Sequence, residues 1–289
     1  MIPMNNLWAI REGAMAQIEI DSAMLEAAHK AEAARAGDSA SFVRAGRIAV
    51  IPIIGPLSRH YDIFTYFFGG TAYSDIIQQA TDAANDELID AILLTVNSPG
   101  GTVDGLADAL DALLAAKAKK PMYAQVIGEA DSAAYYLISN ATAIYAGRAD
   151  MIGNIGTRLT VYDTSKAFAD AGIEAIVIET GPLKVLAEDG MPINQEKRDE
   201  LRRIVDVYYQ DFVRQVVQGR GYTDSEVKEV ATGRIFIGQE AVDAGLVDAI
   251  QPPSVTMAAL NTAIDAAQSR KGRSGSVRRA SAIARARVR

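Results

Sequence analysis

Strand-length and helix-length patterns alternate along most of the chain. Residues 47–55 (RIAVIPIIG) are apolar and rich in β-branched side chains, which is typical of a buried strand. Residues 103–118 place leucines at spacings of three and four, so one helix face is buried. Further strands are predicted at 89–96, 122–127, 142–146 and 175–179, further helices at 74–85, 132–140, 165–171 and 195–218, and a strand–helix pair at 234–244. Such alternation predicts an α/β fold with a mostly parallel sheet flanked by helices.

The two ends of the chain differ from this central part. Residues 1–45, with an Ala- and Glu-rich stretch at 23–36, predict an N-terminal helical segment. Residues 268–289 are rich in Arg, Ser, Ala and Gly and predict a disordered tail. Residues 270–289 hold eight basic and no acidic side chains, which leaves 21 basic and 36 acidic side chains for the rest. A basic tail on an acidic body suits contact with an acidic protein or DNA, or simple solvation.

The composition excludes several classes of site. There is no cysteine, so disulfides, thiol catalysis and thiolate metal centres are ruled out. His29 and His60 are the only histidines, which argues against a multi-histidine metal site, and no cofactor is expected. The N-terminus lacks a signal-peptide pattern, and the apolar runs are too short to span a bilayer. We therefore expect a cytoplasmic protein without a membrane span.

Two turns between a predicted strand and a predicted helix are candidate sites. Residues 97–101 (NSPGG) end in adjacent glycines, whose backbone N–H groups can approach a ligand closely. Such a turn forms a phosphate cradle, an oxyanion hole or simply a tight connection. The turn matches neither GxGxxG nor GxxxxGK[ST], which disfavours a nucleotide site. In the second turn, Ser132 falls at the start of a helix, where a serine is either a helix cap or a raised nucleophile.

A serine nucleophile needs a base, and no histidine follows His60. A lysine whose charged form is disfavoured by burial can serve instead. Lys184 is the candidate, because it is the only cation between Lys166 and Lys197 and has apolar neighbours. The alternative is a solvated surface lysine.

Five stretches in this order resemble the S49 serine peptidases, which comprise the signal peptide peptidase A group and the phage head-maturation capsid peptidases. They are Val96–Gly101 (VNSPGG), Gly128–Tyr136 (GEADSAAYY), Gly153–Thr157 (GNIGT), Thr180–Lys184 (TGPLK) and Arg234–Asp248 (RIFIGQEAVDAGLVD). The resemblance implies a ClpP/crotonase-like fold, with an S49-like peptidase domain over residues 46–267.

The resemblance also implies a catalytic Ser–Lys dyad. Ser132 maps to the nucleophile and Lys184 to the general base, and the backbone N–H groups of Gly101 and Ala133 map to the oxyanion hole. This chain departs from the family in having Ala133-Ala134 after the serine instead of a glycine pair. It also has Asn154 where the family commonly has a serine that orients the lysine. An asparagine oxygen can accept the same hydrogen bond.

The expected function is that of a serine endopeptidase that processes scaffold proteins during phage or prophage capsid assembly, in the bacterial cytoplasm or in a procapsid. The resemblance implies a ring-shaped homo-oligomer in which Ser and Lys of one site can come from neighbouring subunits, and the sequence leaves open whether Lys184 serves its own chain or a neighbour. Alternatives are a cytoplasmic signal-peptide-peptidase-like enzyme, a crotonase-like acyl-CoA enzyme and a capsid component without activity. A Ser–His–Asp peptidase on the same fold is excluded, because Thr157 stands where its histidine would fall.

Overall fold

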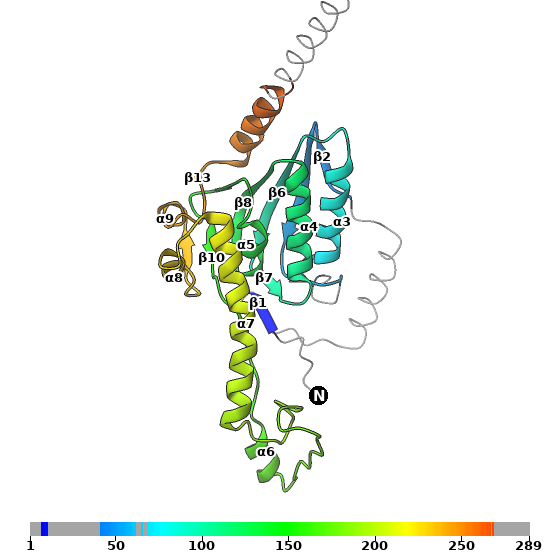
Figure 1. Ribbon diagram of the computed structural model, residues 1–289, viewed down its shortest axis with the longest axis vertical. Helices are drawn as coiled ribbons and strands as arrows, with labels where there is room; N and C mark the ends of the chain where they lie inside the picture. The colour runs from blue at the N-terminus through cyan, green and yellow to red at the C-terminus, as the bar shows by residue number, and fades with distance from the viewer. Residues whose placement is uncertain (1–6, 11–40, 62–64, 66–68, 267, 269–289) are drawn as a thin grey trace, which may run out of the picture.

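The computed structural model describes residues 7–10, 41–61, 65, 69–266 and 268 (Figure 1). A central sheet runs in the order β12-β10-β8-β6-β3-β2. Neighbours from β3 to β10 are parallel, and β2 and β12 are antiparallel edge strands. The strands are β2 (Val43–Ala45), β3 (Ile48–Ile54), β6 (Ala91–Ser98), β8 (Met122–Asp131), β10 (Met151–Gly153) and β12 (Ile235–Ile237). Two shorter strands, β9 (Ala143–Ala146) and β13 (Ala249–Ile250), extend the sheet beside the first half of β8.

A second, smaller sheet lies at the carboxyl end of the central one. Its strand order is β11-β1-β7-β4-β5. The strands are β1 (Leu7–Ile10), β4 (Leu57–Ser58), β5 (Thr71–Ala72), β7 (Gly100–Thr102) and β11 (Arg158–Leu159). Because β7 starts two residues after β6 ends, the small sheet is formed by segments that leave the ends of the central strands.

Helices lie on both faces of the central sheet, several on one face and, on the other, a C-terminal helix that packs only on the first residues of β3, β6 and β8. Alternate residues of β3 show this division, since successive side chains of a strand point to opposite faces. Ala49, Ile51 and Ile53 belong to the main core with the helices α3 (Tyr73–Asn85), α4 (Leu106–Lys119) and α5 (Ala133–Ile138). Ile48 packs instead with Leu260 of a C-terminal helix at residues 253–266.

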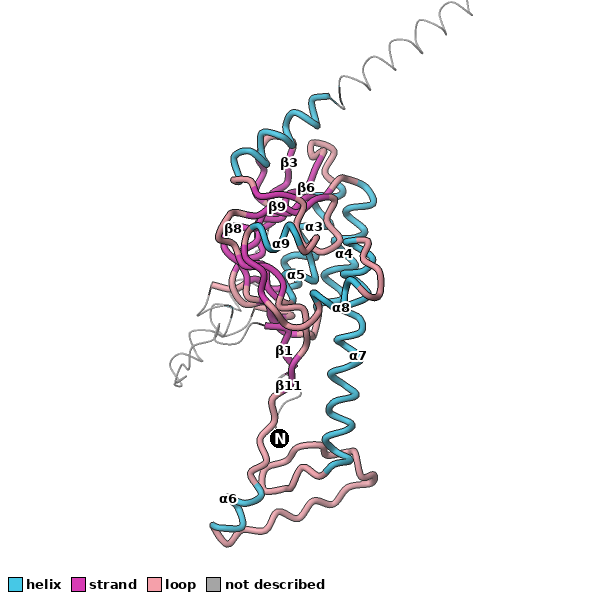
Figure 2. Tube along the Cα trace, turned by 90° about the vertical axis from the view of Figure 1, so that its left-hand side faces the viewer, coloured by secondary structure: helices cyan, strands magenta, loops and turns pink. Residues whose placement is uncertain are grey.

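The long helix α7 (Gln195–Arg220) joins the body to a projecting arm (Figure 1). The arm consists of the first half of α7, the helix α6 (Ser165–Asp170) and residues 171–194. The second half of α7 packs on the core through Phe212 and Val216. Its first half extends away from the body, and α6 and residues 171–194 lie at its far end (Figure 2). Two short helices, α8 (Glu226–Val230) and α9 (Gln239–Asp243), follow α7 in the body.

The predicted α/β fold with a mostly parallel sheet flanked by helices is confirmed. Two local predictions were wrong. Residues 7–10 are a strand rather than part of a helical segment, because they pair with β7 and β11, which lie far along the chain. Residues 43–45 are also a strand, because they form an antiparallel hairpin with β3, the next strand in sequence. Residues 175–179 form no strand, since no other described segment of the chain pairs with them.

Other predictions about the ends stay predictions. The Ala- and Glu-rich stretch at 23–36 and the basic residues 270–289 lie outside the described residues, so the helical N-terminus and the disordered tail are not tested. The boundaries 1–45, 46–267 and 268–289 are likewise untested. Within the part of the chain that the structure describes, no helix is long and apolar enough to cross a membrane.

Candidate active site

Ser132 lies at the sharp turn from β8 into α5 and has an unusual backbone. Its φ of 54° and ψ of −120° fall in a region that residues with a side chain rarely adopt. Ser132 occupies the N-cap position of α5, yet its side chain makes no capping hydrogen bond. A capping serine has extended backbone geometry and uses its hydroxyl oxygen on the helix N–H groups. The helix-cap interpretation of Ser132 is therefore wrong, and the strain points to another role.

Asn154 lies directly beside this turn. The N–H of Ser132 donates to the carbonyl of Gly153 at 2.7 Å, which continues the parallel pairing of β8 with β10. Asn154 has a φ of 48°, and among the described residues it and Ser132 are the only non-glycine residues with positive φ. Its side-chain amide donates to the carbonyl of Gly233 at 2.8 Å, which holds the side chain in place. The predicted nucleophile and the predicted lysine-orienting residue are thus brought together.

The NSPGG turn is held rigidly at the junction of the two sheets. The Ser98 hydroxyl donates to the carbonyl of Gly55 at 2.6 Å and accepts the N–H of Gly100 at 3.2 Å. A Cβ atom on Gly101 would lie 1.9 Å from the carbonyl oxygen of Leu57, so only glycine allows β4 to pair here. Residue 101 is therefore glycine for packing reasons, whatever its amide does in addition.

The helix that begins after Ser132 is a buried platform. All six residues of α5 are buried. The Tyr135 hydroxyl donates to the carbonyl of Leu246 at 2.8 Å, and the Tyr136 hydroxyl donates to Asp211 of α7 at 2.7 Å. Tyr136 also meets Phe212 edge to face, with ring centroids 5.3 Å apart. The backbone N–H of Ala133, as the first in α5, belongs to the group that an α-helix leaves without an internal acceptor.

Burial and hydrogen bonding shift the protonation of the Tyr136–Asp211 pair in opposite directions. Burial, followed by the hydrogen bond to Asp211, raises the pKa of Tyr136 well above its usual value. Burial opposes ionisation of Asp211, but the hydrogen bonds from Tyr136 and Arg214 outweigh it and lower the pKa of that carboxyl. A neutral phenol donating to a carboxylate is stable at neutral pH and fixes α5 against α7.

Lys184 is not brought to Ser132 within the chain. It is exposed, in the segment between α6 and α7 at the far end of the arm (Figure 1). Ser132 lies beside the half of α7 that contains Asp211, and sixteen residues of helix, about 24 Å, separate Asp211 from the arm end of α7 at Gln195. The structure therefore assembles Ser132, Asn154, Gly101 and Ala133 at one place and holds Lys184 at another.

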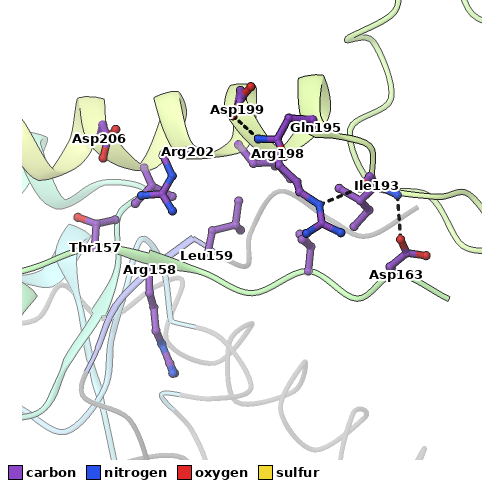
Figure 3. A pocket seen from close by; sticks show the side chains of 13 residues that line it. Thr157, Arg158, Leu159, Asp163, Ile193, Gln195, Arg198, Asp199, Arg202 and Asp206 are labelled. Atoms are coloured by element: carbon purple, nitrogen blue, oxygen red, sulfur yellow. Dashed lines mark hydrogen bonds between the residues drawn. The ribbon is translucent and has the colours of Figure 1, made fainter.

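Two cavities lie near these residues. One of about 620 Å³ separates β11 from the first half of α7, where Arg198 and Arg202 alternate with Asp199 and Asp206 (Figure 3). The other, of about 340 Å³, lies against α5 and is lined by Tyr136, by Thr157, by apolar side chains of α4 and α7 and by the charged side chains of Asp211 and Arg214. Two of its lining residues are close in sequence to the candidate site: Val103 lies two residues after Gly101, and Thr157 lies three residues after Asn154. This cavity is therefore lined by residues that follow both Gly101 and Asn154 in the chain.

Two features of the site escaped the sequence analysis. The Tyr136–Asp211 pair joins residues 75 positions apart, and no local pattern links them. The pairing of β1 with β7 also escaped it, because a four-residue strand gives little periodicity. Among the described residues, no cluster of His, Asp and Glu is arranged to hold a metal ion.

Comparison with known proteins shows that the sequence of this chain is similar to those of proteases. The model of peptidase family S49 matches residues 115–267, a range that contains Ser132, Asn154 and Lys184. The capsid assembly protease C of Escherichia phage lambda is 31% identical over 228 residues, which are 77% of this chain and 51% of that protein. The head-tail preconnector protein GP5 of Enterobacteria phage P21 is 27% identical over 218 residues, 75% of this chain and 43% of that protein.

A candidate signal peptide peptidase SppA of Enterococcus faecium is 30% identical over 181 residues, 62% of this chain and 52% of that protein. The chain thus spans about half the length of the curated relatives it matches. A solved structure of an enoyl-CoA hydratase/isomerase family member aligns with a TM-score of 0.46 at 18% identity, over 77% of this chain and 75% of that one.

Proposed function

Because this chain belongs to peptidase family S49, we propose that it is a serine endopeptidase with Ser132 as nucleophile and Lys184 as general base. The observation that carries the proposal is the strained, non-capping conformation of Ser132 beside Asn154. Neutral Lys184 would take the hydroxyl proton while the serine oxygen attacks the peptide carbonyl. The amides of Gly101 and Ala133 would hold the oxyanion, and the protonated lysine would give its proton to the leaving amine as the peptide bond breaks. Water, deprotonated by the neutral lysine, would then hydrolyse the ester of Ser132 and free the second product.

We propose that the lysine reaches the serine from a second copy of the chain. The arm presents apolar side chains to solvent, with Ile178 96% and Ile176 79% exposed. Residues 175–179 have a strand-like sequence without a partner among the described residues. Burying this surface against another subunit would be favourable and would carry Lys184 away from its own body toward a neighbour's Ser132. The functional unit would then be a homo-oligomer with composite sites.

Complementation between inactive variants tests this arrangement. Ser132→Ala and Lys184→Ala should each abolish cleavage of a casein-like substrate. If sites are composite, subunits of the two variants exchanged into one assembly should regain activity, because some sites then combine an intact serine with an intact lysine. Activity that stays absent after verified exchange would contradict sharing between subunits. Activity retained by either single variant would contradict the dyad.

The pH profile gives a second test of the lysine. Only the neutral amine can accept the serine proton, so the rate of wild-type cleavage should rise with pH. A rate that is flat from neutral to alkaline pH, with the fold intact by circular dichroism, would argue against Lys184 as the base.

We further propose that the substrates are scaffold or capsid proteins, cut in the bacterial cytoplasm or in a procapsid. This rests on the likeness to a protein named as a capsid assembly protease over three quarters of the chain. The 340 Å³ cavity beside Tyr136 combines apolar side chains such as Leu106 and Phe212 with the charged pair Asp211 and Arg214, so it could hold a substrate side chain that has an apolar stem and a polar end. Incubation with purified capsid and scaffold proteins of a lambda-like phage should give a few defined fragments.

The second candidate is a peptide-degrading enzyme, which the likeness to the signal peptide peptidase SppA candidate favours. Such an enzyme would cut short apolar signal peptides and leave folded capsid and scaffold proteins intact. Measuring both substrate sets with the same preparation separates the two functions. A crotonase-like acyl-CoA activity would survive Ser132→Ala, since that chemistry needs no Ser–Lys pair.

A further inference from the structure

The strand β1 fills a position between two strands of the candidate site. It pairs antiparallel with β7 through Trp8↔Thr102, Ala9↔Gly101 and Ile10↔Gly100. On its other edge it pairs antiparallel with β11, with Leu7↔Leu159 and Trp8↔Arg158. In Figures 1 and 2, β1 lies at the end of the body from which the arm projects, close to β7 and β11. A segment from the N-terminus is therefore the central strand between two segments that lie far along the chain.

Both strands that pair with β1 contain or closely follow a residue of the candidate site. The strand β7 contains Gly101, whose amide is the proposed oxyanion donor and which lies in register with Ala9. The strand β11 begins four residues after Asn154. Gly153, next to Asn154, accepts the N–H of Ser132. The backbone of residues 7–10 thus runs alongside the segments that carry the oxyanion hole and the lysine-orienting residue.

Without β1, the site would present two facing open edges. The other edge of β7 is already taken by β4, with Leu57 in register with Gly101. Among the described residues, β11 pairs with β1 alone. Strands in a sheet lie about 4.8 Å apart, so the space between β7 and β11 is one strand wide. An extended peptide can add to open strand edges through main-chain hydrogen bonds, independently of most of its side chains.

We propose that residues 7–10 occupy the slot in which an extended substrate peptide must lie to reach Ser132, so that the chain's own N-terminal segment competes with substrate. The inference rests on the proposed peptidase function and adds the regulation of its site. The occupant is held by only five registered pairs, three to β7 and two to β11. A longer substrate that pairs along the same edges can displace it. The enzyme would then cleave slowly a substrate that pairs weakly with β7 and β11, and it would cleave readily a substrate that pairs strongly enough to displace residues 7–10.

Binding to an inactive enzyme tests the slot without relying on catalysis. The Ser132→Ala variant would be prepared as the full chain and as a chain that lacks residues 1–10. A fluorescent peptide with the sequence of residues 1–14 should bind the shortened chain at least about tenfold more tightly, because a tethered competitor acts at an effective concentration near millimolar. A scrambled peptide of the same composition is the control. Equal affinity of both chains would overturn the proposal.

Kinetics with the intact serine give the second measurement. Removing residues 1–10 should lower KM about tenfold or more and leave kcat within about twofold, as expected when a tethered competitor is removed. The peptide of residues 1–14, added to the shortened chain, should restore the higher KM competitively. Unchanged KM would overturn the proposal. If cleavage persists in the Ser132→Ala chains, the nucleophile is misassigned, and the binding measurement still decides the slot.

A point variant guards against loss of fold in the shortened chain. Ala9→Pro in the full chain removes an N–H and breaks pairing at the centre of β1, whereas Ala9→Ser keeps the N–H. Ala9→Pro should lower KM in the same direction as the deletion, and Ala9→Ser should behave as wild type. If both the deletion and Ala9→Pro lose cooperative unfolding and activity, β1 is a structural strand and the proposal is wrong.

Discussion

The two halves of the proposed dyad stand in opposite environments. Ser132 is 1% exposed, at the start of a helix that is buried along its whole length and bonded on two sides. Lys184 is exposed, on an arm whose apolar side chains face solvent. Precise, strained geometry needs a dense surrounding that over-determines it, and the body supplies one. The described arm has no comparable surrounding around Lys184, which is consistent with the proposal that a second copy of the chain completes it.

The largest expected effect tests whether the strain at Ser132 serves catalysis. Ser132→Gly should lower the rate of cleavage about 10³-fold or more, as loss of a nucleophile does. The same change should raise the free energy of unfolding by about 1 kcal/mol, because glycine adopts positive φ without cost. Urea unfolding with Ser132→Ala as the matched control measures the second effect, since alanine keeps the strain. A glycine variant less stable than the alanine variant would contradict this account.

Removing one core side chain tests the rigidity of the platform. Phe212 is 2% exposed and packs against Tyr136. Phe212→Ala should lower the free energy of unfolding by about 3 kcal/mol, through lost burial and the cavity that remains. Tyr162→Ala is the control on the arm side, where the side chain is 72% exposed, and it should change stability by less than about 0.5 kcal/mol. If urea unfolding shows comparable losses of stability for the two variants, the body is not more densely packed than the arm.

Charge placed on the arm should act on assembly and not on folding. Ile178→Asp should leave the free energy of unfolding of the isolated subunit within about 0.5 kcal/mol of wild type, because this side chain is almost fully exposed. It should dissociate the proposed oligomer and lower activity about tenfold or more, since burying an unpaired carboxylate in an apolar interface is costly. Light scattering and cleavage assays measure both. Leu88→Asp, at an exposed leucine of the body, is the control that should change neither.

The smallest effect concerns the hydrogen bond between α5 and α7. Tyr136→Phe should lower the free energy of unfolding by about 1–2 kcal/mol at neutral pH, because Asp211 loses a donor to its charged form. The pKa of Asp211 is lowered in the folded chain, so its contribution is complete above the unfolded value of about 3.9. That contribution is lost as the pH falls through the lowered value. The difference between the variant and wild type should therefore shrink with acidity, and a constant difference would exclude this mechanism.

The order of elements was predictable because local pattern and tertiary environment agree there. The strand at Ile48–Ile54 is apolar on both faces, and helices pack along the whole of one face and on the start of the other, at Ile48. Ser132 was predictable as a strand–helix junction, although its cap and nucleophile interpretations stayed open. Its φ and ψ decided against the cap. The match to family S49 then confirmed the predicted family over the part that holds Ser132 and Lys184.

Two other predictions failed for a reason that they share. Residues 175–179 have strand-forming side chains, yet they form no strand because a strand needs a partner edge and no described segment provides one. Residues 7–10 became a strand because the edges of β7 and β11 were available to them. Pairing is a property of two segments, so neither outcome could be seen in one of them alone.

The sequence by itself determined the alternation of strands and helices, the absence of thiol chemistry and the scarcity of histidine, which favours lysine as the proposed base. These properties depend only on residue types and on local pattern, so they can be predicted from the amino-acid sequence. Only the tertiary structure decided that Ser132 is strained and free of a capping role, that Asn154 lies beside it and that Lys184 lies far away. It also decided that the N-terminal strand lies between β7 and β11. Each of these depends on which distant segments pack together, and that is settled by burial and backbone pairing across the whole chain.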